Sequence, residues 1–384
     1  MGQSNIAAGA TIGSNHNSRS ADGELMAGRG FWPGLCVSLK HNTRFATFAI
    51  VAKGDYPAEL NIPIPFSLSS NDVTNNRLVV MPGYWFMYNM FALERNGRKY
   101  PERDKRQEKI QYLENNYLAP DSISEMLDAL QLLQKFTGKA WYKKEVVVQE
   151  ISDTEATAKG KQLLEDNDAV VNELEILAEG FENTKRKVVL IKVLKAYHLF
   201  KELIQYYCIN EIIGLIGDNE MNDFTTLPNS LPAKNTLHVW MNVGGQLMPR
   251  AEVDSITKKI RAGKIKSWDA LHDFYLHQAA LYKSQKLSHA LAAFYTSTGT
   301  RPGKMNKETF KKLLTSAINT KEWMTKAIYD SRAKDHTNAF RKMPFENQQE
   351  MDAVVGKLED NSFIKQQQQD LENYKLQIQA YLQW

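Results

Sequence analysis

The sequence predicts an α+β protein in which a β-rich part is followed by a large, mostly α-helical part. Two observations support this prediction. Residues 1–83 are rich in Gly, Asn, Ser and Pro and contain short β-type runs, whereas later residues show the 3.6-residue apolar spacing of helices. We therefore predict two domains, 1–83 and 84–384, with a further boundary possible in the polar, proline-containing loop 217–235.

Composition and charge are those of an ordinary globular chain. Of 384 residues, 43% are hydrophobic and 24% are charged, and the formal net charge of +4 is too small to indicate nucleic-acid binding. The two cysteines, Cys36 and Cys208, lack the spacing of a zinc site, which favours a reducing compartment. The strongest apolar run, 188–194, is short and contains Lys192, and the first residues do not resemble a signal peptide. We therefore expect a cytoplasmic protein with no membrane span and no cofactor.

The segments "IAAGAT" and "IGSNHN" place Ile6 and Ile12 six positions apart, with small and polar residues between them. An aliphatic residue at every sixth position is typical of the left-handed parallel β-helix, where Gly and Asn occupy tight corners because positive φ is cheap for them. One such coil cannot bury its own interior, so these repeats would stack on further coils or on another part of the structure. Two repeats alone are weak evidence, and an ordinary loop and strand explains them somewhat better.

Short strands are also predicted in the rest of the β-rich part. Residues 45–53 and 77–82 have the composition of strands. Residues 61–66, "NIPIPF", alternate proline with apolar residues, which forces an extended backbone and removes hydrogen-bond donors. This segment is therefore predicted to be an edge strand or a strap.

The helical part begins with an aromatic stripe that predicts a helix facing the core, formed by Tyr84, Met87, Tyr88 and Phe91. A charged helix is expected over 103–118, and the next helix is expected to begin at a Ser122–Glu125 capping box and to stop at Gly138. Residues 153–216 show a long helical pattern, and 236–245 are predicted to form a strand and turn. Further helices are predicted over 251–262, 267–298, 306–335, 347–358 and 362–383.

Six segments carry a resemblance to a known family. They are "IGSNHNSRSADGE", "GRGFWPGLCVSLKHNTRF", "KGDYPAELNIPIPFSL", "VMPGYWFMYNMFALERN", "FRKMPF" and "MDAVVGKLEDNSFIK". They resemble an uncharacterised Bacteroidetes-type family related to trimeric left-handed β-helix proteins of the UDP-N-acetylglucosamine acyltransferase-like, hexapeptide-repeat class. The resemblance implies that the chain is the carboxy-terminal part of such a protein, and that its β-rich part is the end of a left-handed parallel β-helix.

The best candidate catalytic neighbourhood is "SLKHNTRF", residues 38–45. The resemblance implies a histidine general base at a subunit boundary, beside basic groups that hold phosphates. His41 is the candidate base, and the candidate substrate- or phosphate-binding residues are His16, Arg19, Arg29, Lys40, Asn42 and Arg44. The alternative is that His41 lies in a polar turn while Arg44 covers a sheet edge.

Other polar motifs are weaker. Asp273 and His277 lie one turn apart on a predicted helix and could hold a metal, but ion pairs on a solvent-facing helix explain them better, so no metal site is predicted. The basic stretches 185–187 and 258–266 are predicted to be solvated helix faces. Residues 242–246, "NVGGQ", lack the lysine of a phosphate-binding loop.

Two functions follow from these observations. The first is a sugar or nucleotide-sugar acyl or nucleotidyl transferase of the hexapeptide class that works as a homotrimer on a sugar-nucleotide or sugar-phosphate ligand. The second is a non-catalytic trimeric scaffold or binding protein whose helices form an interaction surface. Both hypotheses exclude nucleic acid as the partner.

Overall fold

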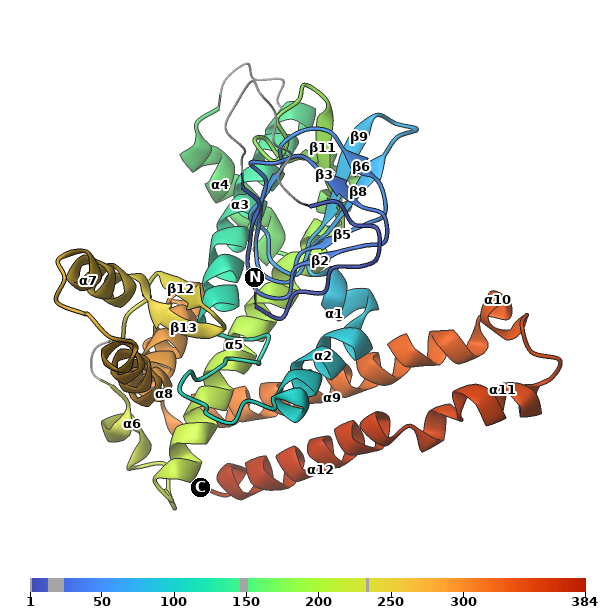
Figure 1. Ribbon diagram of the computed structural model, residues 1–384. Coiled ribbons are helices and arrows are strands. Elements are labelled where there is room, and N and C mark those ends of the chain that lie inside the picture. The colour runs from blue at the N-terminus through green and yellow to red at the C-terminus, as the bar shows by residue number, and fades with distance from the viewer. Residues whose placement is uncertain (1, 13–23, 146–150, 233–234) are drawn as a thin grey trace.

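The β-rich part is a stack of short coils (Figure 1). The computed structural model describes residues 2–12, 24–145, 151–232 and 235–384. Seven two-residue strands come first, and two five-residue strands follow: β1 (Met26–Ala27), β2 (Trp32–Pro33), β3 (Ser38–Leu39), β4 (Arg44–Phe45), β5 (Ile50–Val51), β6 (Asp55–Tyr56), β7 (Asn61–Ile62), β8 (Leu68–Asp72) and β9 (Arg77–Met81).

The strands form three parallel ladders that the chain visits in turn. The ladders are β1-β4-β7, β2-β5-β8 and β3-β6. Met26 pairs with Arg44, 18 positions later, and Ser38 pairs with Asp55, 17 positions later. Each strand therefore lies directly against the strand one coil further along the chain.

The corners between strands repeat every six residues. Positive φ occurs at Gly30, Cys36, Asn42 and Phe48, and it occurs again at Phe66. Left-handed backbone is normally restricted to Gly and Asn, so Cys36 and the two phenylalanines are held there by the surrounding coil. The strand predicted over 45–53 is consequently wrong in its middle, because the corner at Phe48 separates β4 from β5.

The interior of the coils is filled mainly by apolar side chains. Phe31 stacks on Phe45 with ring centroids 4.7 Å apart, and Phe48 stacks on Phe66 at 4.9 Å. Ile62 is also fully buried, although β7 lies at the end of its ladder as predicted for an edge. Stacked aromatic rings thus join successive coils through the interior.

The first described residues form one more coil on this stack. The backbone N–H groups of Asn5 and Ala7 donate to the carbonyls of Phe31 and Pro33, and Thr11 forms a parallel bridge with Ser38. Ile6 thus lies beside Pro33, an interior position, yet its side chain is 46% exposed. Within the described residues no coil covers Ile6 from the other side.

A six-stranded sheet crosses the predicted domain boundary at residue 83. Its order is β10-β11-β9-β8-β5-β2, with β10 at Ile176–Leu177 and β11 at Lys187–Leu190. The uninterrupted helical pattern predicted over 153–216 is therefore wrong in its middle. The β-branched pair Val188–Val189 is buried when β11 adds to β9 in parallel register, and this pairing overrides helix propensity.

The remaining chain is largely helical. The helices are α1 (Tyr84–Tyr88), α2 (Met90–Arg103), α3 (Pro120–Glu145), α4 (Asp153–Glu165), η1 (Ala169–Glu173), α5 (Val193–Asp218), α6 (Leu227–Ser230), α7 (Arg250–Arg261), α8 (Trp268–Thr298), η2 (Pro302–Lys304), α9 (Lys307–Thr337), α10 (Ala339–Lys342), α11 (Gln348–Val355), η3 (Leu358–Asp360) and α12 (Ser362–Leu382), with a hairpin of β12 (Trp240–Val243) and β13 (Gln246–Pro249) between α6 and α7. The predictions for the helices after residue 250 are confirmed to within a few residues. In Figure 1, α9 and α12 run side by side as a long two-helix arm.

The start of the helical part differs from the predicted aromatic stripe. Tyr88 is 40% exposed, and the buried side chains are Trp85, Phe86 and Met90. The helix breaks between α1 and α2, so a single helical period does not extend across it. Trp85 instead points to the coil stack, where its indole N–H donates to the Phe48 carbonyl at 2.6 Å.

The charged helix predicted over 103–118 is also wrong. Helix α2 ends at Arg103, two residues after Pro101, and an irregular segment leads to α3. Its backbone bonds elsewhere: the Glu114 N–H donates to the Gly245 carbonyl, and the carbonyls of Glu114 and Asn116 accept from Arg29. Tertiary partners therefore replace the helical ones.

Helix α3 neither begins nor ends at the predicted signals. It begins at Pro120, and the Ser122 hydroxyl, inside the first turn, bonds to the Tyr117 carbonyl. Gly138 lies within the helix rather than at its end. A Cβ atom there would lie 1.7 Å from the Ala156 carbonyl oxygen, so glycine allows α3 and α4 to touch at the backbone.

Among the helices of the described ranges, none combines the length and apolar character needed to cross a membrane.

Candidate functional site

The predicted catalytic residue, His41, lies at a corner of the coil stack. Lys40, His41 and Asn42 connect β3 to β4, and Asn42 has φ +59°. The Lys40 N–H donates to the Tyr56 carbonyl and the Lys40 carbonyl accepts from the Thr43 hydroxyl at 2.7 Å. On the other side of His41, the Asn42 N–H donates to the Glu24 carbonyl at 3.1 Å, so the backbone around His41 is held by the coils on either side.

The His41 side chain is half-buried and has an unused hydrogen-bonding atom. Its Nδ1 atom is buried without a hydrogen-bond partner among the described residues. Lys40 is exposed beside it. On the next coil, the Asn183 amide lowers the pKa of Glu59, with smaller contributions from the charges of Lys40 and His41. The corner therefore combines an imidazole, an ammonium and a carboxylate near one another.

The other predicted ligands are distributed differently. Asn42 shares the corner with His41 and is exposed, and Arg44 lies on the adjoining strand β4, also exposed. His16 and Arg19 lie outside the described residues. Arg29 is at another corner and is almost fully buried, with 1% of its surface exposed. The structure thus brings together Lys40, His41 and Asn42 but not Arg29.

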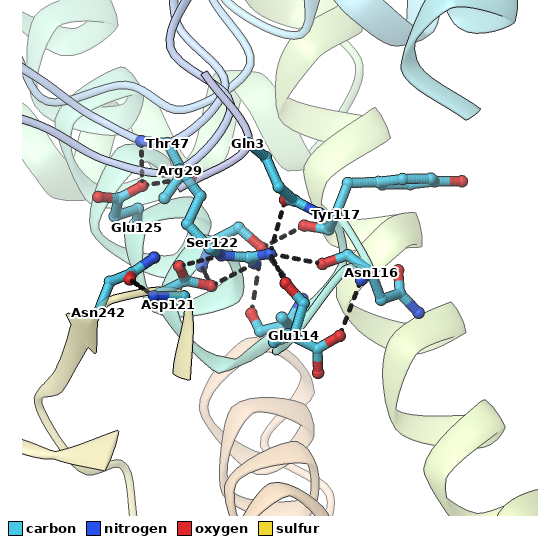
Figure 2. Close-up of polar contacts among 12 residues, drawn as sticks. Gln3, Arg29, Thr47, Glu114, Asn116, Tyr117, Asp121, Ser122, Glu125 and Asn242 are labelled. Atoms are coloured by element: carbon cyan, nitrogen blue, oxygen red, sulfur yellow. Dashed lines mark hydrogen bonds and ion pairs between the residues drawn. The ribbon is translucent and has the colours of Figure 1, made fainter. Parts of the chain in front are cut away.

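Arg29 is the centre of a buried cluster of polar groups (Figure 2). Its Nε and Nη2 atoms each donate to Asp121 at 2.7 Å, one to each carboxylate oxygen. Its Nη1 atom bonds to the Gln3 side chain at 3.1 Å and to the carbonyls of Glu114 and Asn116 at 3.1 and 3.0 Å. Burial disfavours the charged guanidinium, but Asp121, Glu114 and Tyr282 together outweigh it, so the pKa of Arg29 is raised.

A second contact joins the coils to α3 beside this pair. The Thr47 N–H and hydroxyl donate to Glu125 at 2.8 and 2.6 Å. Burial is the main reason that the pKa of Glu125 is raised to about 7, against the lowering effect of the Thr47 hydrogen bonds. We call this set of residues the Arg29 junction: Arg29, Thr47, Glu114, Asp121 and Glu125.

The polar cluster continues into the helical part. The Tyr282 hydroxyl donates to Glu114 at 2.5 Å, and Lys286 lies 3.4 Å from Glu114 and 3.0 Å from Glu211. His289, fully buried, bonds to the Ser124 hydroxyl at 2.9 Å, and burial lowers its pKa to about 3. A chain of paired charges therefore extends from the coil corner to α5 and α8.

Sequence reasoning missed most of this cluster. Asp121 lies 92 positions from Arg29, and no local motif links the two. Glu125 was predicted to close a capping box, whereas it accepts hydrogen bonds from Thr47, 78 positions away. The signal that could have been noticed is Gly28–Arg29–Gly30, because glycines on both sides allow a coil to approach closely.

The predicted metal-capable motif stays on the surface of α8. Asp273 and His277 are exposed. In the described ranges, no three His, Cys, Asp or Glu side chains come together in a way that could hold a metal ion. Cys36 is exposed and Cys208 is buried, and both are free thiols.

Comparison with known proteins finds similarity to a family model over part of the chain. Residues 225–379 match a family described as a domain of unknown function, DUF6819. An uncharacterized protein from Treponema pallidum (strain Nichols) is 36% identical over 366 residues, which cover 95% of this chain and 48% of the relative. The chain thus spans about half the length of the curated relative it matches. No solved structure matches the chain significantly.

Proposed function

We propose that the protein is a hexapeptide-class sugar or nucleotide-sugar transferase-like protein, with His41 as its general base and the coil stack as the end of a left-handed parallel β-helix. The observation that carries the proposal is the His41 imidazole, held at a coil corner with Nδ1 unpaired among the described residues. The 17- and 18-residue offsets between paired strands and the six-residue repeat of corners support the β-helix.

The geometry of the corner suits acyl transfer. The His41 imidazole accepts the proton of a sugar hydroxyl while that oxygen bonds to the carbonyl carbon of an acyl thioester. The carbon–sulfur bond then breaks, and the departing thiolate takes the proton from the imidazolium. The exposed side chains of Lys40, Asn42 and Arg44 are close along the chain and could bind the phosphates of the sugar nucleotide.

A homotrimer would complete such a site. A groove between neighbouring coil stacks would enclose the half-buried imidazole and exclude water from the reacting atoms. Light scattering on the purified protein tests this part of the proposal. We expect the mass of three chains, and a monomer at micromolar concentration would contradict it.

Thiol release tests the catalytic role. The protein is mixed with UDP-N-acetylglucosamine and acetyl-CoA, and free thiol is followed over time. Wild type should release thiol, and His41→Asn should lower the rate by about 100-fold or more. His277→Asn, at an exposed histidine on α8, is the matched control and should retain the wild-type rate.

A second candidate is a non-catalytic trimeric scaffold. The observation that favours it is Arg29, whose three guanidinium nitrogens donate to protein groups: the Asp121 and Gln3 side chains and the Glu114 and Asn116 carbonyls. In that role the junction fixes the helical part to the coils, and the helices form the interaction surface. A stable trimer with no thiol release and unchanged behaviour of His41→Asn would favour the scaffold.

A further inference from the structure

The helical part contains a polar cavity that is separate from the His41 corner. It lies between α2, residues 115–118, α5, α9 and α12, and its volume is about 680 Å³. This is within the range of small-molecule sites. We propose that this polar cavity binds an uncharged sugar ring through its hydroxyl groups, independently of the function proposed for His41.

The cavity wall is rich in side chains that can both donate and accept hydrogen bonds. Amides come from α5, α12 and the 115–118 segment: Asn115, Asn116, Asn210, Gln366 and Gln367. Carboxylates come from three different helices: Glu94, Glu211 and Asp370. A ligand with many hydroxyl groups can satisfy both kinds of partner at once, because each hydroxyl donates one hydrogen bond and accepts others.

One amide in the wall has an unused acceptor. Gln367 is 3% exposed, and its Oε1 atom has no hydrogen-bond partner among the described residues. Buried polar atoms are nearly always paired, so an unpaired one that lines a cavity indicates a missing partner. The matching partner for a carbonyl oxygen is a donor such as a hydroxyl group.

The charges around the cavity favour an uncharged ligand. Glu211 is paired with Lys286 at 3.0 Å, and Arg98 with Glu102 at 2.7 Å. The cavity lining then contains two further carboxylates, Glu94 and Asp370, and one further cation, Lys321. A phosphate would meet two carboxylates, and a cationic ligand would meet Lys321.

Aromatic residues in the wall complete the match with a sugar; besides Tyr117, two come from α5. Tyr206 and Tyr207 of α5 line the cavity next to Asn210. The Tyr206 ring lies 6.3 Å from the Tyr374 ring of α12, centroid to centroid, so Tyr206 is packed against that helix. Apolar ring faces beside polar groups suit the C–H and O–H groups that alternate on a sugar ring.

Ligand-observed saturation-transfer NMR on the whole protein tests the proposal. The probes are glucose, N-acetylglucosamine and UDP-N-acetylglucosamine, with UDP alone as the nucleotide control. We expect transfer to the ring protons of the neutral sugars, and Gln367→Leu should weaken their binding about tenfold, as expected for one lost hydrogen bond. The matched control is Gln368→Leu, one position along α12 at an exposed site, which should bind like wild type.

Further variants separate this site from the His41 corner and from folding defects. His41→Asn should still bind the neutral sugars, even if it abolishes thiol release. If Gln367→Leu lowers the melting temperature markedly, Glu94→Gln gives an independent reading of the same cavity, because the amide still accepts from the Tyr117 hydroxyl. The proposal is overturned if no neutral sugar receives saturation, if only UDP-containing probes do, or if the cavity variants bind as well as Gln368→Leu.

Discussion

The coil stack and the Arg29 junction are stabilised in different ways. In the stack, each short strand bonds to the strand 17 or 18 positions away, and the interior is apolar. In the junction, side chains 78 and 92 positions apart meet as buried ions and hydrogen-bonded carboxylates. A stack shares its stability over many similar contacts, whereas a buried ion pair fails when one partner is removed.

The comparison indicates where change is tolerated. At the corner that contains His41, the neighbouring side chains of Lys40 and Asn42 are exposed, so this corner has groups that a ligand can reach. The junction has no such freedom, because each of its charged groups is already hydrogen-bonded within the protein. Substitutions in the stack and in the junction can therefore be ranked by the loss of stability that each should cause.

Arg29→Met should have the largest effect. Removing the guanidinium leaves Asp121, whose side chain is 13% exposed, as an unpaired carboxylate in the junction. The free energy of unfolding should fall by about 3–5 kcal/mol, which urea denaturation can measure.

Arg44→Met is the control for this variant. Arg44 is exposed, and its replacement should change stability by less than about 0.5 kcal/mol. The double variant Arg29→Met/Asp121→Leu should recover part of the loss, since no charge is then left unpaired. A loss below about 1 kcal/mol for Arg29→Met would mean that the junction is not what holds the two parts together.

Glu125 should give the junction a pH dependence of the opposite sign to that of most paired carboxylates. Its pKa in the folded protein is about 7, above the ordinary value of 4.5, because of burial. The folded state therefore binds more protons between these values, and this contribution to stability is present below pH 4.5 and is lost as pH rises through 7. Relative to Glu125→Gln, wild type should lose about 3 kcal/mol between pH 4.5 and 8.

Urea denaturation of both proteins at a series of pH values checks this difference. Groups other than Glu125 contribute equally to both curves and cancel. A difference that stays constant with pH would show that Glu125 is solvated in the folded protein.

Glycine substitutions should distinguish the corner next to Arg29 from another corner of the stack. Gly30 has φ +69°, and a Cβ atom there would lie 2.2 Å from the Phe48 ring, which is itself stacked on Phe66. Gly30→Ala should cost about 2 kcal/mol, from backbone strain and from displacement of the ring. Thermal and urea unfolding measure the loss.

Gly54→Ala is the matched substitution at the corner between β5 and β6. Its Cβ atom would lie 3.5 Å from Tyr56, an ordinary contact. Its effect should be within about 0.5 kcal/mol of zero. Equal losses at the two glycines would mean that all corners are equally tight.

How well the sequence predicts each region depends on how far apart in the sequence its interacting residues lie. The coil repeat and the helices after residue 250 depend on local spacing, and local spacing is visible in a single sequence. The prediction of a helix over 103–118 was wrong because Arg29 and Gly245, which are distant in the sequence, form hydrogen bonds with the backbone of this segment. Buried pairs such as Arg29–Asp121 leave no local pattern, so they could not be predicted from residue types.

The smallest effect on stability should come from substitution of His41, which lies at a corner of the coil stack. His41→Asn removes a half-buried ring whose Nδ1 has no partner among the described residues, so no hydrogen bond to that atom is lost. The free energy of unfolding should change by less than about 0.5 kcal/mol in urea denaturation. By contrast, His289→Asn should cost about 1–3 kcal/mol, because His289 is fully buried and bonds to Ser124. If His41→Asn were as destabilising as His289→Asn, the His41 ring would be part of the packing, and the corner would resemble the junction rather than a site open to a ligand.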